Sequence, residues 1–282
     1  MTDEPDRYAV IGNPVDHSRS PAIHAMFAEQ TGQRMTYTRL PAAEDAFTAT
    51  VERFFADGGR GLNVTLPFKQ AAAAYAATLS ARAERAGAVN TLIRCDDGRI
   101  HGDNTDGVGL LRDLTGRLST PIEGRRVLVL GAGGAVRGVV PVLLEQGPKH
   151  LYIANRTAER AEAIAADFTD LGPVDAGGLA GIGGGWDLVI NAISAGLAGR
   201  MPDLPAAAIA GATAAYDMIY ADAPTPFLRW AERHGVARRC DGFGMLVEQA
   251  AESFHLWRGV RPDTRAVIAA LHPAPQGRDD TV

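Results

Sequence analysis

The stretch "RVLVLGAGGAVRGVV" (126–140) decides the fold class of this chain. Its first five residues form a continuous strand pattern, which is typical of a strand buried on both faces of a parallel sheet. A glycine turn follows at once, and the apolar pattern after it predicts a helix. In a dinucleotide-binding unit, glycines at this point let the backbone approach a pyrophosphate at the N-terminus of the helix. The residues that we expect to hold this group are Gly131, Ala132, Gly133, Gly134 and Ala135.

The end of the next strand indicates which dinucleotide binds. Asn155, Arg156 and Thr157 end this strand, and Arg160 lies one helical turn further on. An acidic residue here would take the ribose hydroxyls of NAD, whereas a guanidinium suits a 2′-phosphate. We therefore expect NADP(H). Two alternatives stay open: a tight turn without a ligand, since Val136 replaces the third glycine of G-x-G-x-x-G, and arginines that simply lie at the surface.

Strands and helices alternate along the rest of the chain, which indicates an α/β architecture. We expect strands over Tyr8–Ile11, Met35–Leu40, Leu62–Thr65, Val89–Arg94, Ile100–Gly102, Arg126–Leu130, Leu151–Ala154, Leu188–Ile190 and Ala214–Met218. We expect helices over Pro21–Glu29, Ala43–Phe55, Phe68–Ala77, Ala81–Ala86, Val108–Leu118, Ala158–Phe168 and Met245–Trp257. The Asp-Gly pair at 97–98 predicts a hairpin, the glycine-dense segment 177–185 a connecting loop, and the tail after His272 a frayed end.

Composition excludes several classes of protein. The chain has 282 residues, a net charge of −5 and no basic stripe, so we expect no nucleic-acid partner. No apolar run reaches the ~20 residues of a membrane span, and the acidic N-terminus is unlike a signal peptide, so we expect a cytoplasmic protein. Cys95 and Cys240 stand alone, which predicts reduced, buried thiols. The seven His residues show no metal-ligand spacing, so we expect no metal.

A lysine in "GLNVTLPFKQ" (61–70) is placed where a helix disfavours it. Lys69 begins an alanine-rich helical pattern with no acidic neighbour, and the positive end of the helix and partial burial both disfavour the ammonium form. Hydride transfer to a carbonyl needs a group that handles a proton at its oxygen, so Lys69 is a candidate. Asp106 in "GDNTDGVG" (102–109) is the best-placed partner, although an N-cap of the following helix is the alternative.

Eight motifs along the chain resemble, in order, the motif set of the shikimate dehydrogenase family. They are "GNPVDHSRSP" (12–21), "NVTLPFK" (63–69), "GAVNTL" (87–92), "GDNTDG" (102–107), "GAGGA" (131–135), "NRT" (155–157), "YDMIY" (216–220) and "DGFGMLVEQA" (241–250). The resemblance runs from about Tyr8 to Val260. It implies an enzyme that reversibly reduces 3-dehydroshikimate to shikimate with NADPH in aromatic amino-acid biosynthesis.

The resemblance also implies roles for individual residues and two α/β domains. Lys69 and Asp106 would form the catalytic pair. The residues that would bind substrate are Ser18, Ser20, Thr65, Asn90, Tyr220 and Gln249. Met218 and Gly242 would lie beside the nicotinamide. An α/β substrate domain would span 1–106, a Rossmann-like NADP-binding domain with a parallel sheet would span 107–240, and the helical segment 241–282 would return to the first domain.

Simpler roles stay open for several of these residues. Ser20 before Pro21 suits an N-cap. Gln249 lies off the apolar face of its helix and would then point into solvent. Met218 would be an ordinary core residue, and Tyr220 suits a surface anchor. Two other functions also stay open: a relative that oxidises quinate as well, often with NAD, and a non-catalytic dinucleotide-binding regulator. The protein is expected to act as a monomer or a homodimer on a small-molecule substrate.

Overall fold

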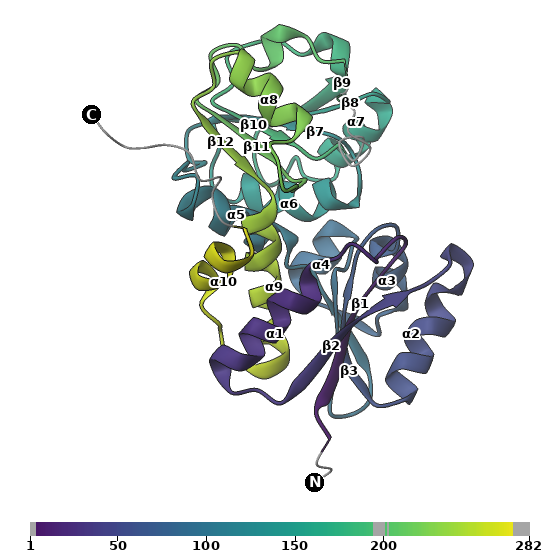
Figure 1. Ribbon diagram of the computed structural model, residues 1–282. Helices are drawn as coiled ribbons and strands as arrows, with labels where there is room; N and C mark the ends of the chain where they lie inside the picture. Colours follow the sequence, from purple (N-terminus) through teal and green to yellow (C-terminus); the bar gives the residue numbers. More distant parts are fainter. Residues whose placement is uncertain (1–3, 194–200, 202, 273–282) are drawn as a thin grey trace, which may run out of the picture.

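The computed structural model describes residues 4–193, 201 and 203–272, which form two α/β halves (Figure 1). The first half contains a six-stranded sheet in the order β2-β1-β3-β5-β6-β4. Its strands are β1 (Asp6–Gly12), β2 (Met35–Pro41), β3 (Gly59–Val64), β4 (Thr78–Leu79), β5 (Thr91–Arg94) and β6 (Ile100–Asp103). β1 runs parallel to β2 and β3, whereas β5 is antiparallel to β3 and β6. The predicted hairpin at the Asp-Gly pair is confirmed, because it joins β5 to β6.

Four helices belong to this half: α1 (Ser20–Thr31), α2 (Phe47–Ala56), α3 (Lys69–Tyr75) and α4 (Ala81–Ala86). The predicted bounds of α4 are confirmed. The helix predicted from Ala43 begins instead with a 3-10 turn, Glu44–Ala46, before α2. The apolar side chains of α2, α3 and α4 pack on the sheet, and Phe47, Phe55, Leu62 and Phe68 lie in that core.

The second half contains a six-stranded, wholly parallel sheet in the order β12-β11-β10-β7-β8-β9. Its strands are β7 (Arg126–Leu130), β8 (His150–Asn155), β9 (Val174–Gly178), β10 (Leu188–Asn191), β11 (Ala214–Asp217) and β12 (Arg238–Asp241). Helices α6 (Gly134–Leu144), α7 (Ala158–Ala166) and α8 (Pro226–Arg233) accompany it. This is the strand order of a Rossmann sheet, so the predicted fold class is confirmed.

Some predictions for this half were incomplete or wrong. Residues 127–130 of β7 are fully buried, as the continuous apolar run predicted. The glycine-dense segment 177–185 is not entirely a loop, because β9 runs to Gly178 and a 3-10 turn, Leu179–Gly181, follows. β9, α8 and β12 had not been predicted. The tail after His272 lies outside the described residues.

Two helices carry the chain between the halves. α5 (Asp106–Gly116) leaves the first half and α9 (Phe243–Arg258) returns to it, and the two pack along each other (Figure 1). A Cβ at Gly109 would lie 2.8 Å from Gln249 N, so only glycine permits this approach. α9 and α10 (Thr264–Leu271) then pack on α1 through an apolar cluster that includes Ile23, Phe27 and Phe254. No helix in the described ranges is long and apolar enough to cross a membrane.

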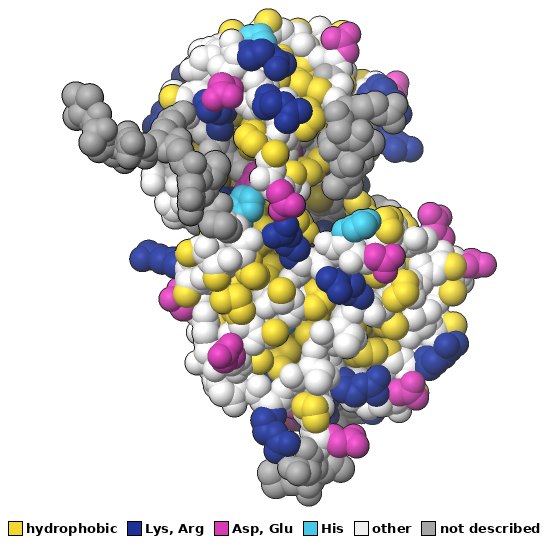
Figure 2. Space-filling model, viewed as in Figure 1, with side chains coloured by type: hydrophobic (Ala, Val, Ile, Leu, Met, Phe, Trp, Pro, Cys, Tyr) yellow, Lys and Arg dark blue, Asp and Glu magenta, His cyan; other side chains and the backbone are white. Residues whose placement is uncertain are grey.

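The surface follows this division. Figure 2 shows the two halves as separate lobes with a narrowing between them. On this face basic and acidic side chains are interspersed.

Candidate active site

Lys69 and Asp106 form a close ion pair between the two halves. Lys69 is the first residue of α3, and its Nζ lies 2.6 Å from Asp106 Oδ2. Their side chains are only 13% and 6% exposed, so the charges face each other largely shielded from water. An ion pair in such surroundings is much stronger electrostatically than one at a protein surface. The partner that Lys69 lacks in its own helix is therefore supplied from 37 positions further along the chain.

Asp106 does not cap its helix. It is the first residue of α5, Thr105 occupies the N-cap position, and no side chain caps that position. The alternative of an N-cap is therefore wrong. Asn104 Oδ1 accepts the hydrogen bond of Asp106 N at 3.1 Å, which satisfies one of the free amides of the helix start. This leaves both carboxylate oxygens of Asp106 for side chains.

Asn90 and Gln249 lie in the same polar cluster as the pair. Asn90 Nδ2 donates to Asp106 Oδ1 at 2.8 Å and is 3.3 Å from Gln249 Oε1. Gln249 is only 9% exposed, so the alternative that it points into solvent is wrong. The structure thus brings together four of the predicted residues, Lys69, Asp106, Asn90 and Gln249, from α3, α5, α9 and the segment before β5.

Ser18 and Ser20 form a second group at the start of α1. Ser18 Oγ accepts a hydrogen bond from Ser20 N at 3.3 Å, and Arg39 donates to Ser18 O. Ser20 is buried and is the first residue of α1, with Arg19 in the N-cap position, so the alternative of Ser20 as an N-cap is wrong. Both hydroxyls therefore lie at the start of α1, where Arg19 in the N-cap position makes no side-chain cap.

The two remaining substrate candidates flank these groups without touching the ion pair. Thr65 is half-buried, its N–H bonds to Ile11 O at 2.9 Å, and its carbonyl accepts from Phe68 N just before Lys69. Tyr220 packs edge-on against Phe243 with 5.7 Å between ring centres. It is half-buried, so it is more enclosed than a surface anchor.

The glycine turn lies opposite Lys69. Gly131 has φ +114, and a Cβ there would lie 3.1 Å from Ala192 O, so this position requires glycine. Gly133 is the N-cap of α6, has no side-chain cap and borders open space. A Cβ at Gly134 would lie 3.9 Å from Lys69 Cβ. The N-terminus of α6, where Gly133 makes no side-chain cap, could hold the pyrophosphate of a dinucleotide.

The predicted adenosine-phosphate residues follow β8. Asn155 Nδ2 donates to Thr157 O at 2.9 Å and closes the turn between β8 and α7. Arg156, Thr157 and Arg160 are exposed, and neither guanidinium has an ion pair with a residue in the described part of the chain. Two exposed, unpaired cations at this corner suit a phosphate group.

Met218 and Gly242 lie near each other after β11 and β12, at the same carboxyl end of the parallel sheet as the glycine turn. Met218 is half-buried against the core of this half, and Gly242 N donates to Ile219 O at 3.2 Å. Asp217 holds the same loop, since its Oδ1 accepts from Ile219 N at 3.1 Å. Burial raises the pKa of Asp217, although bonds from Thr225, Ile219 and Asn191 oppose that shift. Met218 therefore packs partly as a core residue. The loop that carries it is held at the end of the sheet by Asp217.

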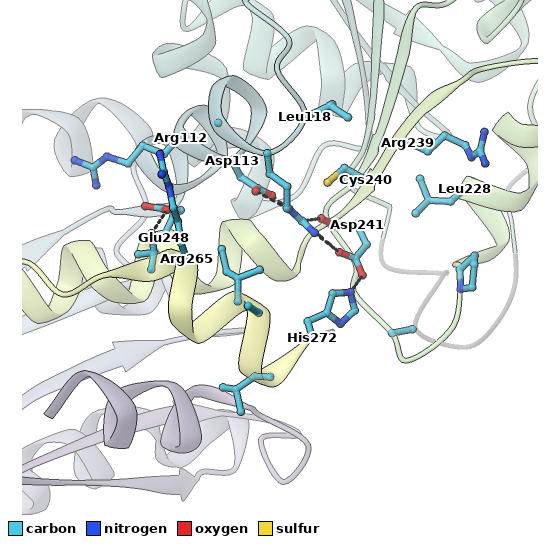
Figure 3. A pocket seen from close by; sticks show the side chains of 18 of the residues that line it. Arg112, Asp113, Leu118, Leu228, Arg239, Cys240, Asp241, Glu248, Arg265 and His272 are labelled. Atoms are coloured by element: carbon cyan, nitrogen blue, oxygen red, sulfur yellow. Dashed lines mark hydrogen bonds and ion pairs between the residues drawn. The ribbon is translucent and has the colours of Figure 1, made fainter. Parts of the chain in front are cut away.

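One cavity lies away from this site. It measures about 1380 Å³, lies among α5, α9, α10 and β12, and is lined by none of the predicted site residues (Figure 3). Arg117 spans Asp113 and Asp241 there, and His272 contacts Asp241 at 2.8 Å (Figure 3). These ion pairs join α5, the end of β12 and the residue after α10. Within the described ranges, no group of three or more His, Cys, Asp or Glu could hold a metal ion.

Sequence reasoning missed two buried hydroxyls behind the cluster, those of Thr91 and Ser253. Thr91, Thr105 and Ser253 are fully buried and bond to one another or to Asn90. One signal was available, because Ser253 lies four residues after Gln249 and so on the same face of α9. Asn63, whose Nδ2 donates to Ser253 Oγ at 2.9 Å, completes the set.

A Rossmann-ordered sheet, an uncapped glycine turn and a shielded Lys–Asp pair between two α/β halves define a dinucleotide-dependent dehydrogenase. The family models agree with this class. The "Shikimate dehydrogenase substrate binding domain" matches residues 10–92, the "Shikimate / quinate 5-dehydrogenase" model matches 113–197, and the "Shikimate 5'-dehydrogenase C-terminal domain" matches 242–272. The chain belongs to the shikimate dehydrogenase family.

Individual relatives cover nearly the whole chain. A shikimate dehydrogenase (NADP(+)) from Alkalilimnicola ehrlichii is 57% identical over 268 residues, which are 95% of this chain and 99% of that protein. The crystal structure of an Ael1 enzyme from Pseudomonas putida matches with a TM-score of 0.88 at 47% identity, covering 95% and 99% of the two chains. Shikimate 5-dehydrogenase from Thermus thermophilus, in complex with NADP(H) and shikimate, matches with a TM-score of 0.85 at 37% identity, covering 94% and 98%.

Proposed function

We propose that this protein catalyses the reversible, NADPH-dependent reduction of 3-dehydroshikimate to shikimate. The observation that carries the proposal is the Lys69–Asp106 pair, 2.6 Å apart, facing the glycine turn across the gap between the halves. Relatives named as shikimate dehydrogenase (NADP(+)) over almost the full length support the substrate and the cofactor.

The chemistry follows from this arrangement. NADPH, when bound, supplies a hydride to the substrate carbonyl carbon. Lys69 Nζ gives a proton to the carbonyl oxygen during reduction and takes it back during oxidation. Asp106 holds the amine at one fixed point, so that the proton donor does not have to be reoriented during the reaction. The low exposure of both side chains keeps water from competing for that proton.

The remaining predicted residues divide between the two ligands. Ser18 and Ser20 bind the substrate carboxylate at the start of α1, and the hydroxyl groups of the substrate bind to Thr65, Asn90 and Gln249, with Tyr220 at the rim. The uncapped glycine turn, Gly131 to Ala135, supports a pyrophosphate site. Asn155, Arg156, Thr157 and Arg160 hold the 2′-phosphate corner, and Met218 and Gly242 lie beside the nicotinamide.

The domains that we propose are 1–106 for substrate and 107–240 for NADP, with 241–282 returning to the first. Sheet membership supports this division, because β1 to β6 form one sheet and β7 to β12 the other. The packing of α9 and α10 on α1 supports the return of the C-terminal segment. We also propose a cytoplasmic location and a monomer or homodimer, which sedimentation of the purified protein would distinguish.

An activity assay of the purified protein tests the function. NADPH oxidation with 3-dehydroshikimate, and NADP⁺ reduction with shikimate, should both proceed at a kcat typical of enzymes, about 1–10³ s⁻¹. The matched reactions with quinate and with NAD(H) should be at least tenfold less efficient. Equal efficiency with quinate or NADH would indicate the broader quinate/shikimate activity instead, and no turnover with 3-dehydroshikimate would indicate a non-catalytic dinucleotide-binding protein.

A further inference from the structure

The carboxamide of Asn90 is held on both sides by protein groups. Its Oδ1 accepts hydrogen bonds from Thr105 N at 2.8 Å and from Thr91 Oγ1 at 2.9 Å. A backbone N–H can only donate, so the oxygen must face Thr105 N and the amino group must face Asp106. Asn90 is 2% exposed, and its orientation is therefore decided by the protein.

Two fully buried hydroxyls stand in line behind this carboxamide. Thr91 Oγ1 lies 2.8 Å from Ser253 Oγ, which is closer than the 3.1 Å between Ser253 Oγ and Gln249 O. The proton of Thr91 is directed at Asn90 Oδ1, which can only accept. Ser253 Oγ donates to Gln249 O and lies within hydrogen-bond distance of Thr91 Oγ1, where either hydroxyl can be the donor.

Asn63 closes the network on the side away from the ion pair. Its Nδ2 donates to Ser253 Oγ at 2.9 Å, and its Oδ1 accepts from Tyr37 OH at 2.7 Å. Burial raises the pKa of Tyr37 well above its ordinary value, so the phenol stays protonated and can donate. A continuous chain of hydrogen bonds thus runs from Tyr37 through Asn63 and Ser253 to Thr91 and Asn90.

We propose that the hydroxyl of Thr91, with that of Ser253 behind it, is a positioning group for the catalytic ion pair. It fixes the carboxamide of Asn90, which holds Asp106 Oδ1 at 2.8 Å while Oδ2 of the same carboxylate holds Lys69 Nζ at 2.6 Å. Because both of its oxygens are held, the Asp106 carboxylate cannot rotate, and the Lys69 amine keeps one orientation. The inference rests on the proposed function, because its effect is on the proton-transfer step.

The matched variants Thr91→Val and Thr91→Ser separate this role from a structural one. Valine keeps the shape of threonine and suits β5, so the protein should fold, but it lacks the hydroxyl. We expect kcat for 3-dehydroshikimate reduction to fall about tenfold, the factor expected from one lost buried hydrogen bond. The KM for NADPH should not change, and the pH profile of kcat should be displaced. Thr91→Ser keeps the hydroxyl and should recover most of kcat.

Two further variants keep the test decisive. Thr115→Val makes the same chemical change at an exposed threonine of α5 and should match the parent in kcat and thermal midpoint. Ser253→Ala should lower kcat in the direction of Thr91→Val, and it takes the place of that variant if Thr91→Val does not fold. A kcat within twofold of the parent, or an equal loss in Thr91→Val and Thr91→Ser, would overturn the inference. An inactive parent overturns the proposed function as well, whereas an active parent with an unaffected variant overturns this inference alone.

Discussion

His24 should make the stability of the protein depend on pH. It lies on α1, is fully buried, and neither ring nitrogen has a hydrogen-bond partner within the described residues. Its ring stacks on Tyr37 with 4.0 Å between centres and lies against Phe254 and Trp257. Burial lowers the pKa of His24 to about 3, and the nearby Asn63 side chain opposes this shift only in part.

The direction of the effect follows from which state binds the proton. The unfolded chain takes up a proton at His24 as the pH falls through about 6.5, whereas the folded protein does so only near pH 3. The stability contributed by the neutral ring is therefore complete above pH 6.5 and is lost progressively as the pH falls below it. Between pH 7.5 and 5 this loss is about 2 kcal/mol.

Urea unfolding of three proteins at these two pH values measures the effect. The free energy of unfolding of the parent should fall by about 2 kcal/mol more than that of His24→Leu, which cannot titrate at this position. His255→Gln, a change at an exposed histidine of α9, should follow the parent. An identical decline in the parent and in His24→Leu would refute the reasoning, whatever their absolute stabilities.

Three further predictions concern the site and its frame. Lys69→Ala should lower kcat about 10²–10⁴-fold with NADPH affinity unchanged, as measured by steady-state kinetics and fluorescence titration; an intact kcat would reject Lys69 as the proton-transfer group. Arg160→Ala together with Arg156→Ala should raise the KM for NADPH at least tenfold while leaving that for NADH within twofold, and an equal effect on both would exclude a 2′-phosphate site. Gly109→Ala should cost about 1–3 kcal/mol in denaturant unfolding, because α5 and α9 must separate, and an unchanged midpoint would contradict that close contact.

In the parallel sheet, the sequence predicted the central strands well and the edge strands poorly. β7 was predicted with its observed bounds because both of its faces are buried, which produces a continuous apolar run. β9 and β12 lie at the two edges of the same sheet, and their sequences, "VDAGG" and "RRCD", lack that pattern. Their pairing depends on neighbouring strands. α8 did carry a signal, since Thr225 before Pro226 is a typical helix start, and Thr225 does cap it.

The site residues also divide into those that the sequence revealed and those that it did not. Lys69 was detectable because its place at a helix start is unfavourable, Asp106 was the best-placed acidic partner in the sequence, and the family resemblance supplied the substrate. Thr91 and Ser253 lie 162 positions apart, and an ordinary strand residue and an ordinary helix residue give no local sign that their hydroxyls meet. Such contacts exist only once α9 has returned to the first sheet.

That return also sets an order of events during synthesis. The apolar side chains of Ile23 and Phe27 on α1 become covered only when they pack against Phe243, Phe254 and Val267. These three residues are synthesised last. At the rate of ribosomal synthesis, these residues emerge about 10–50 seconds after α1. The parallel sheet, in contrast, is complete once β12 has emerged. The half that is made first therefore finishes folding second, and a chain that stops before α9 leaves an uncovered apolar face for chaperones and proteases to bind.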